Sequence, residues 1–217
     1  ELAFMSRKAS ILGRKEVLGG KAKFGIFGDG KELAQIAMAK VFRPGDWRSG
    51  YYRDQTFMLA TETSTLEAFF AQLYADTNLD REPHSGGRQM NCHYATRYID
   101  NEGKWLEQSK TKNISSDISS TGGQMARLLG LAYASKLYRE VPVLTESTQS
   151  KKFSENGKEI AFGTIGNAST SEGHFWEVMN ACGVLKLPVI MSVWDDGYGI
   201  SVPNEHQTIK ESISEAL

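Results

Sequence analysis

Residues 163–201, GTIGNASTSEGHFWEVMNACGVLKLPVIMSVWDDGYGIS, decide the fold. The stretch continues a short, apolar, β-rich segment that begins at residue 160 and passes through a turn of small residues into an amphipathic segment. Pro188 is expected to end that segment, and Val189–Trp194 is predicted to be a buried strand. Five apolar residues recur at helical spacing and predict a helix with one buried stripe: Phe175, Val178, Met179, Cys182 and Leu185. The pattern predicts a βαβ unit with parallel strands and a right-handed crossover.

A polar turn follows each of the two predicted strands. The first, residues 166–169 (GNAS), places small residues and backbone N–H groups before the helix, which suits a phosphate. The second, residues 195–199 (DDGYG), brings carboxylates to the same edge of the sheet. Open α/β sheets bind ligands at this edge, and Mg²⁺ prefers phosphate and other hard oxygen ligands. We therefore expect a metal–diphosphate site here.

Spacing alone leaves a structural alternative open for both turns. A turn of small residues precedes a helix in many doubly wound domains, and Asp-Asp-Gly is a frequent turn sequence. By this alternative the two turns only connect the strands to the following segments.

The flanking residues add a resemblance to a known family. The stretch resembles the thiamine-diphosphate motif, in which Gly-Asp-Gly is followed further along the chain by Asn-Asn. It is most similar to the α-type half of the thiamine-dependent 2-oxo acid dehydrogenases, in the segments SEGHFWEVMNACGVLKLPVI and DDGYGIS. The resemblance implies an α/β thiamine-diphosphate-binding fold, an open, mostly parallel sheet with helices on both faces. We expect residues 1–217 to form a single domain of this kind and to be part of a longer chain.

The resemblance also implies a ligand set for the metal. In the family the metal takes the acidic side chain of the first motif, the second amide of the second motif and a backbone carbonyl two residues later. Those positions hold Asn167, Asp196 and Tyr198 here, so the acid and the amide have exchanged places and the charge of the ligand set is conserved. The additional charge of Asp195 has no role in this scheme. Further cofactor contacts are implied at three neighbouring positions: Gly166, Ala168 and Ile200.

Three other segments resemble cofactor-contacting parts of the family. Tyr52 and Arg53 match a Tyr-Arg pair that holds the diphosphate, and arginine offers a planar fork of donors to phosphate oxygens. Ser119 and Thr121 match positions at the aminopyrimidine end of the cofactor. His93 lies in RQMNCHY, which resembles a loop near the active-site channel, so it is a candidate catalytic residue with a structural histidine as the alternative. Without the family, the arginine is a solvated surface residue and residues 113–123 are a capped helix entry.

The remaining segments predict supporting structure. The Gly-Asp-Gly at residues 28–30 has no amide or carboxylate pair at the corresponding place downstream, where Phe57 and Met58 stand, so we interpret it as a strand-to-helix turn. The other expected elements are helices over residues 1–17, 33–41, 63–75 and 124–138, a strand over 23–27, a turn over 42–50, an exposed connection over 140–157 and the start of a helix at 213–217.

Composition excludes several classes of protein. Of 217 residues 40% are hydrophobic and 24% charged, which is ordinary for a globular protein, and the formal net charge of −1 gives no basic field for nucleic acid or an anionic membrane. Cys92 and Cys182 lie in unlike contexts and are expected to be free thiols in a reducing compartment. No apolar run reaches membrane-spanning length, and no secretion signal is recognisable at the N-terminus. We expect a cytoplasmic protein.

The resemblance implies the decarboxylating component of a 2-oxo acid dehydrogenase complex. Such an oxidoreductase decarboxylates a 2-oxo acid oxidatively and transfers the acyl group to a lipoyl group, with thiamine diphosphate and Mg²⁺ as cofactors. The segments SSDISSTGGQ and RQMNCHY are nearer to the branched-chain (2-oxoisovalerate) type than to the pyruvate type. The implied partners are a β-type half, separate or fused, and a lipoyl-bearing acyltransferase core. The β-type half carries the carboxylate that activates the cofactor, so this chain alone is expected to be inactive.

Two alternatives from other classes stay open. Both metal motifs are altered, which is also typical of an inactive or structural thiamine-binding subunit. An α/β domain that binds a nucleotide or another phosphate ligand is the second alternative, although no GxGxxG or GxxxxGK[ST] pattern follows a predicted strand.

Overall fold

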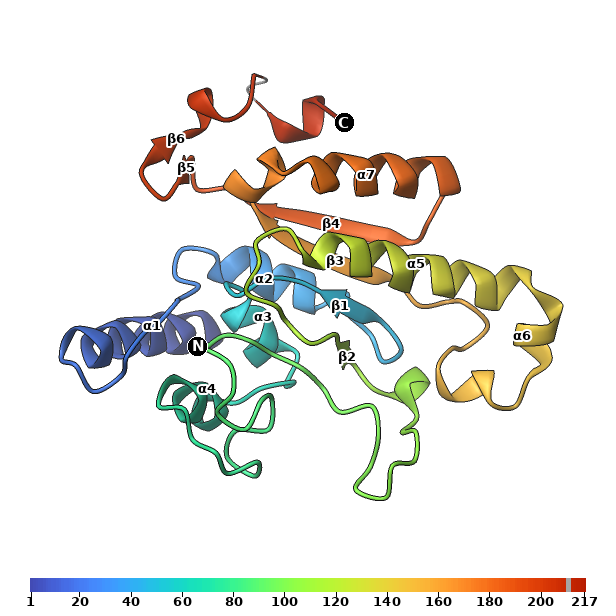
Figure 1. Cartoon of the computed structure of the whole chain (residues 1–217), viewed down its shortest axis with the longest axis horizontal. Coiled ribbons are helices and arrows are strands. Elements are labelled where there is room, and N and C mark those ends of the chain that lie inside the picture. Colours follow the sequence, from blue (N-terminus) through green and yellow to red (C-terminus); the bar gives the residue numbers. More distant parts are fainter. Residues whose placement is uncertain (210–211) are drawn as a thin grey trace. The chain divides into compact units, whose positions relative to one another are not determined.

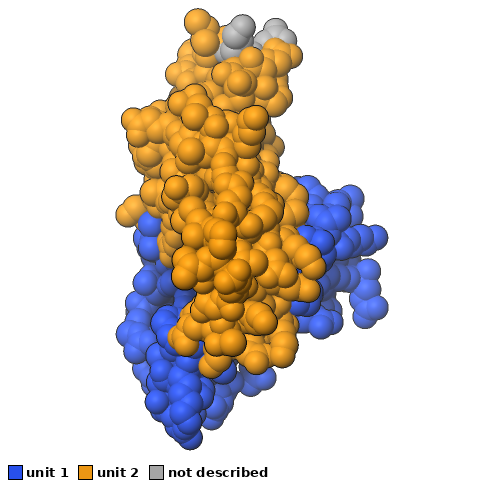
Figure 2. All heavy atoms as spheres, turned by 90° about the vertical axis from the view of Figure 1, so that its right-hand side faces the viewer, with its two compact units in different colours: residues 1–44, 52–106, 112–119 blue, residues 45–51, 107–111, 120–217 orange. Residues whose placement is uncertain are grey.

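A computed structural model describes residues 1–209 and 212–217 of the chain. The fold is mixed α/β with a parallel sheet flanked by helices, as the sequence predicts (Figure 1). The chain divides into two compact units (Figure 2): unit 1 is Glu1–Pro44, Tyr52–Leu106 and Lys112–Ser119, and unit 2 is Gly45–Tyr51, Glu107–Thr111 and Ser120–Leu217. The single domain over residues 1–217 stays a prediction. In the described part of the chain, no helix combines the length and the apolar character that crossing a membrane requires.

Unit 2 contains the predicted βαβ unit. Strand β3 (Ala161–Gly166), helix α7 (Gly173–Leu185) and strand β4 (Val189–Trp194) follow one another, and the two strands pair in parallel along their whole length. Strand β1 (Trp47–Ser49) pairs in parallel with the other edge of β3. The parallel arrangement places the carboxyl ends of all three strands at one edge of the sheet.

The core of unit 2 lies between β3 and two helices, α5 (Gln124–Glu140) and α7, which run alongside the strands in Figure 1. Side chains alternate along a strand, so Ala161 and Ile165 face the helices together. Gly163 between them lets α5 approach, since a Cβ there would lie 2.4 Å from Leu128 Cδ2. Buried Phe175, Val178 and Cys182 confirm most of the predicted stripe of α7, and α5 contributes Met125, Leu128 and Ala132 to the core.

Short elements complete unit 2. Tyr198–Gly199 (β5) and Val202–Pro203 (β6) pair in antiparallel fashion just after β4. The other elements are one short α-helix, α6 (Pro142–Glu146), and five 3₁₀-helices, η1 to η5, in chain order: Gln108–Lys110, Ser150–Lys152, Ala168–Ser171, Asn204–His206 and Ile213–Glu215.

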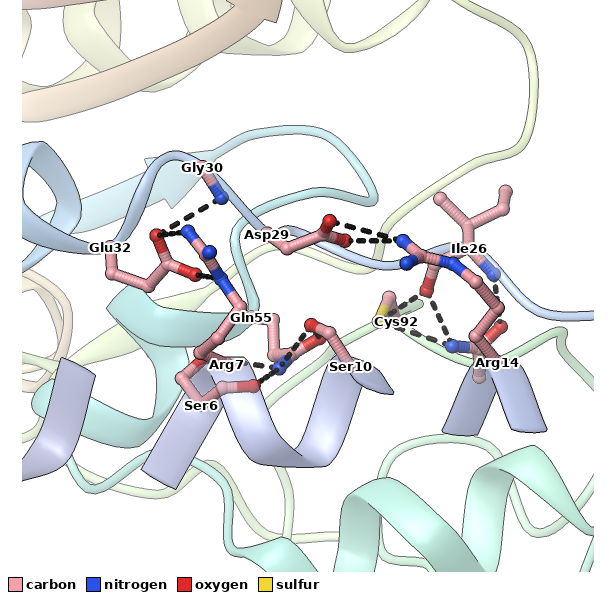
Figure 3. Close-up of polar contacts among 11 residues, drawn as sticks. Ser6, Arg7, Ser10, Arg14, Ile26, Asp29, Gly30, Glu32, Gln55 and Cys92 are labelled. Carbon is pink, nitrogen blue, oxygen red and sulfur yellow. Dashed lines mark hydrogen bonds and ion pairs between the residues drawn. The ribbon is translucent and has the colours of Figure 1, made fainter. Parts of the chain in front are cut away.

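Unit 1 is built around its N-terminal helix. Helix α1 packs against the three other α-helices of the unit, and Figure 3 shows the polar contacts beneath it. Buried Gln55 donates to Ser6 Oγ at 3.0 Å and accepts from Ser10 Oγ at 3.4 Å, while Arg7 and Glu32 form a two-pronged ion pair at 2.6 and 2.9 Å. The elements of the unit are α1 (Leu2–Leu18), α2 (Glu32–Ala39), α3 (Gln55–Ala60), α4 (Leu66–Leu73) and β2 (Asn113–Ile114).

The strand predicted over residues 23–27 is wrong. The backbone N–H of Ile26 donates to Asn91 Oδ1 at 2.9 Å, and the carbonyl of Ile26 accepts from Asn91 Nδ2 at 2.7 Å. One amide side chain therefore satisfies the backbone groups that a neighbouring strand would otherwise bind. The Gly-Asp-Gly that follows is a turn leading into α2, as predicted, with Gly30 at a φ of +97° and Asp29 paired with Arg14 (Figure 3).

Other boundaries differ from the predictions. The turn predicted over residues 42–50 contains β1, and the connection predicted over 140–157 contains α6. Helix α7 ends at Leu185, before Pro188, because Lys186 adopts the left-handed conformation with a φ of +50°. Residues 213–217 contain a 3₁₀-helix and not the start of an α-helix.

Strand β4 is less buried than predicted. Only Trp194 at its end is buried, and 38% of Ile190 is exposed. The strand lies at the end of the strand order in the described sheet, so β3 covers one of its edges and the other edge has no strand beside it among the described residues. The prediction was a buried strand over Val189–Trp194.

Both cysteines are free and buried, which confirms the prediction of free thiols. Burial raises the pKa of the Cys92 thiol to about 12 and also raises the pKa of the Cys182 thiol. Both groups are therefore protonated at neutral pH, and neither has the thiolate character of a reactive cysteine.

Candidate functional site

The two predicted polar turns begin side by side. Gly166 pairs with Trp194 in the parallel ladder, so the residues after β3 and after β4 leave the sheet at the same edge. Asn167 then precedes the 3₁₀-helix η3, and its carbonyl accepts from Thr170 Oγ1 at 2.6 Å. This contact fixes the backbone of the first turn beside the second.

The two turns are in direct contact. Asn167, of which only 4% is exposed, donates from Nδ2 to the carbonyl oxygen of Tyr198 at 3.1 Å. Gly199 allows the approach, because a Cβ at this position would lie 2.7 Å from the Cβ of Ala168. The structure thus brings together three of the residues predicted from the sequence, Asn167, Ala168 and Tyr198.

The two carboxylates of the second turn point to different partners. Asp196 Oδ1 accepts from the backbone N–H of Tyr198 in its own turn, at 3.3 Å. Asp195 Oδ1 accepts from the backbone N–H of Gly197 at 2.8 Å and from Asn204 Nδ2 at 2.9 Å. The charge of Asp195, for which the sequence offered no role, therefore stabilises the turn and holds a residue from beyond it.

That residue, Asn204, links the two turns and was not predicted. Its Oδ1 accepts from Asn167 Nδ2 at 2.5 Å, and its backbone N–H donates to the carbonyl of Gly197 at 3.0 Å. Asn204 follows β6, which turns back antiparallel to β5 and returns the chain to the site. The Gly-rich turn and Pro203 indicate a chain reversal, and this is the only sequence signal for the return of Asn204 to the site.

A tyrosine covers Gly166. A Cβ at Gly166 would lie 3.2 Å from Tyr51 Oη, so a larger residue here would press on that ring. Tyr51 is buried and its backbone N–H donates to Thr164 Oγ1 on β3 at 3.1 Å. The sequence directed attention to the next residue, Tyr52, and missed Tyr51 as a neighbour of the first turn.

Ile200 is held in an unusual conformation. It is fully exposed and has a φ of +59° at the turn between β5 and β6. A β-branched residue at positive φ is strained, and such strain collects at functional sites. The predicted cofactor contact at Ile200 is consistent with this position.

Tyr52, His93 and Ser119 meet in unit 1. The rings of Tyr52 and His93 stack at a centroid distance of 6.4 Å, and His93 Nε2 lies 3.0 Å from Ser119 Oγ. His93 Nδ1 lies 3.2 Å from the carbonyl of Asn91, which only accepts, so Nδ1 carries the proton of the neutral ring and Ser119 donates to Nε2. The ring is 2% exposed, and both its nitrogens have partners.

Arg53 and Thr121 belong to different units. The carbonyl of Arg53 accepts from Gln35 Nε2 at 2.7 Å, and its backbone packs against Gly28, where a Cβ would lie 2.4 Å from that oxygen. Thr121 is exposed in the turn before α5. Helix α5 begins at Gln124, and its N-cap residue Gly123 makes no side-chain hydrogen bond, so the alternative of a helix entry capped by a side chain is wrong. Of the predicted residues, unit 1 contains Tyr52, Arg53, His93 and Ser119, and unit 2 contains Thr121, Gly166, Asn167, Ala168, Asp196, Tyr198 and Ile200.

The described residues exclude one kind of metal site. Within residues 1–209 and 212–217, no three or more His, Cys, Asp and Glu side chains are grouped so as to hold an ion. The predicted ligand set is of another kind, with one carboxylate, one amide and one backbone carbonyl. The amide of Asn167 and the carbonyl of Tyr198 lie together, with Nδ2 of the amide facing the carbonyl oxygen.

Comparison with known proteins gives the family. A family model described as Dehydrogenase E1 component matches residues 1–216. The chain is 30% identical over 201 residues to the 2-oxoisovalerate dehydrogenase subunit alpha of Bacillus subtilis (strain 168), which covers 90% of this chain and 49% of that protein. It is 26% identical over 188 residues to the mitochondrial 2-oxoisovalerate dehydrogenase subunit alpha of Caenorhabditis elegans, covering 87% and 36%. It is 25% identical over 186 residues to the pyruvate dehydrogenase E1 component subunit alpha of Acholeplasma laidlawii, covering 86% and 41%.

The chain spans half or less of the length of these relatives, at 49%, 36% and 41%. The family match, in contrast, runs almost from end to end of the chain. The sequence resemblance is therefore confirmed, and the chain belongs to the dehydrogenase E1 component family.

Proposed function

We propose that this chain supplies the diphosphate- and metal-binding half of a thiamine-diphosphate-dependent 2-oxo acid dehydrogenase. One observation carries the proposal: the hydrogen bond from Asn167 Nδ2 to the carbonyl of Tyr198, which joins the two turns that follow adjacent parallel strands. The family match over residues 1–216 supports the same conclusion.

In this proposal the first turn and the second turn hold the metal jointly. Asn167, Asp196 and the carbonyl of Tyr198 supply the oxygen ligands, and Gly166 and Ala168 keep the first turn small enough for a diphosphate to approach. Bound thiamine diphosphate would supply a carbon nucleophile and an electron sink for the loss of CO₂. The protein's part is to bind and orient this cofactor.

The residues of unit 1 would serve other parts of the cofactor. Tyr52 and Arg53 would donate to the diphosphate oxygens. Ser119 directs its hydroxyl proton to His93 Nε2, so its lone pairs remain available to accept from the amino group of the aminopyrimidine. His93 then acts as a positioning residue for Ser119.

The proposed reaction is the oxidative decarboxylation of a 2-oxo acid with transfer of the acyl group to a lipoyl group. We propose a branched-chain 2-oxo acid as substrate, because two of the three relatives above are 2-oxoisovalerate dehydrogenase subunits. The proposed partners are a β-type half and a lipoyl-bearing acyltransferase core, and the 217-residue chain alone is expected to be inactive.

Calorimetry on the full protein assembled with its β-type half tests this function. We expect thiamine diphosphate to bind only when Mg²⁺ is present, and NAD and ATP not to bind. Binding of NAD or ATP without thiamine diphosphate would favour a domain for another phosphate ligand. Binding of thiamine diphosphate without turnover of any 2-oxo acid would favour the inactive thiamine-binding subunit. Decarboxylation by residues 1–217 alone would contradict the expected inactivity.

Ile200 offers a separate test of the cofactor contact. Ile200→Gly is expected to raise the melting temperature of the full protein by about 2–4 °C, since glycine releases about 1 kcal/mol of strain at positive φ. The same change removes an apolar contact and is expected to weaken thiamine diphosphate binding by about tenfold. Thermal unfolding and calorimetry measure the two effects.

Ser201→Gly is the matched control in the same turn. Ser201 is not at positive φ, so glycine there gains no stability, and the affinity for thiamine diphosphate is expected not to change. If the Ile200→Gly variant is more stable and binds thiamine diphosphate as tightly as the parent, Ile200 does not contact the cofactor.

A further inference from the structure

Three polar groups of unit 2 converge on one point between the two turns. Asn167 Nδ2 donates to the carbonyl of Tyr198 at 3.1 Å and to Asn204 Oδ1 at 2.5 Å. Asn167 is buried, with 4% of its surface exposed, and it belongs to the first turn. The two acceptor oxygens belong to the second turn and to the segment after β6. Asn167 Nδ2 therefore lies between two acceptor oxygens, the carbonyl oxygen of Tyr198 and Asn204 Oδ1.

We propose that Asn204 Oδ1 is a further ligand of the metal and that the Asn167 amide rotates by half a turn when the metal binds. This inference rests on the proposed function. Rotation exchanges the oxygen and the nitrogen of the amide, so that the oxygens of Asn167, Tyr198 and Asn204 face the same point. Three such oxygens repel one another unless a cation lies among them, and Mg²⁺ prefers several oxygen ligands in an octahedral shell.

The orientation of Asn204 supports the proposal. Asn204 Nδ2 donates to Asp195 Oδ1 at 2.9 Å, and an ionised carboxylate only accepts, so this bond directs Oδ1 of the same amide toward Asn167. The backbone N–H of Asn204 is held by the carbonyl of Gly197 at 3.0 Å. An outer carboxylate that orients a ligand is a recurring feature of metal sites, and it gives the charge of Asp195 a role.

Asn204 also restores what the exchange of residues removed. The second turn has a carboxylate, Asp196, where the family has an amide, and Asn204 returns an amide oxygen to that side of the site. The inferred set is one carboxylate, two side-chain amides and one backbone carbonyl, with Asp195 as the outer carboxylate.

The test measures metal binding and not turnover. Mn²⁺ affinity is measured by electron paramagnetic resonance in the assembled protein saturated with thiamine diphosphate. Asn204→Ala is expected to weaken Mn²⁺ binding by about tenfold or more. Equal Mn²⁺ affinity in Asn204→Ala and the parent overturns the inference.

A cysteine substitution separates a ligand from a structural residue. Asn204→Cys is expected to shift the ratio of Cd²⁺ to Mn²⁺ affinity toward Cd²⁺ by about tenfold or more, because a thiolate prefers soft metals. Asn180→Cys, on the exposed side of α7, is the matched control and is expected not to change the ratio at the cofactor site. An unchanged ratio of Cd²⁺ to Mn²⁺ affinity in a folded Asn204→Cys protein overturns the inference. This measurement decides the question if Asn204→Ala fails to fold.

Mn²⁺ binding by the parent protein separates the proposed function from the proposed role of Asn204. If the parent binds no Mn²⁺ in the presence of thiamine diphosphate, the proposed function is wrong, and this inference falls with it. If the parent binds Mn²⁺ and the Asn204 variants behave as the parent does, only the role of Asn204 is wrong.

Discussion

Restoring the family's order of acid and amide, in the double variant Asn167→Asp, Asp196→Asn, is expected to leave Mg²⁺-dependent binding of thiamine diphosphate within about threefold of the parent. Asp196→Asn alone is expected to weaken that binding by about tenfold to hundredfold, because it removes the only carboxylate of the ligand set. Calorimetry on the assembled protein measures the four corners of this double-mutant cycle. The expectation follows from ligand charge, which the exchange conserves.

The single variant Asn167→Asp has an expected signature of its own. In the metal-free protein its carboxylate faces the carbonyl of Tyr198 and Asn204 Oδ1, two oxygens that now accept from the Asn167 amide. Loss of these bonds is expected to lower the free energy of unfolding by about 1–3 kcal/mol without metal, and Mg²⁺ is expected to recover most of it. Thermal unfolding with and without Mg²⁺ measures the difference.

The cycle also has a contradicting outcome. If the double variant binds as weakly as Asp196→Asn alone, Asn167 and Asp196 do not share one ion. In that case Asp196 would remain a residue that accepts from the backbone N–H of Tyr198 within its own turn.

Gly157→Ala is expected to lower the free energy of unfolding by about 2–4 kcal/mol. Gly157 has a φ of +67°, and a Cβ there would lie 2.2 Å from the carbonyl oxygen of Ser135, which is backbone of α5 and has little freedom to move. The N–H of Gly157 also donates to Ser154 Oγ at 2.8 Å, so the turn before β3 is held on two sides. Denaturant unfolding of the full protein measures the loss.

Gly130→Ala is the matched control, with the same substitution in the same unit. Gly130 lies on the exposed side of α5, and a Cβ there would have no atom within 4 Å. Alanine is therefore expected to stabilise the helix by about 0.5–1 kcal/mol. Similar unfolding midpoints for the two variants would show that the turn at Gly157 can relax.

The central part of the fold was predictable because its signals are local and strong. The apolar stripe of α7 and the β-rich segments before and after it specify helix and strands without help from the rest of the chain. Strand β1 has three residues, with charged Arg48 in the middle, and it exists because β3 pairs with it. Residues 23–27 are largely apolar and resemble a strand, but Asn91, far along the chain, binds the backbone N–H and carbonyl of Ile26.

The same distinction applies to the site. Asn167 and Tyr198 were predictable because Asn167 directly follows β3 and Tyr198 lies in the polar segment after β4, and adjacent parallel strands bring such segments together. Asn204 reaches the site only after the chain reverses at β5 and β6, and no spacing rule specifies that return. The cluster of Tyr52, His93 and Ser119 joins three separate segments, so its members were suggested by resemblance and not by any local pattern.

The half-covered strand β4 has a consequence for how this polypeptide behaves in solution. Its sequence VIMSVW has four residues of high β-propensity out of six, with no charge and no proline, and its outer edge has no strand beside it in the described sheet. An open strand edge is a template for strands from other copies, which is how fibrillar aggregation begins. A cover over this edge would therefore also protect the protein from aggregation.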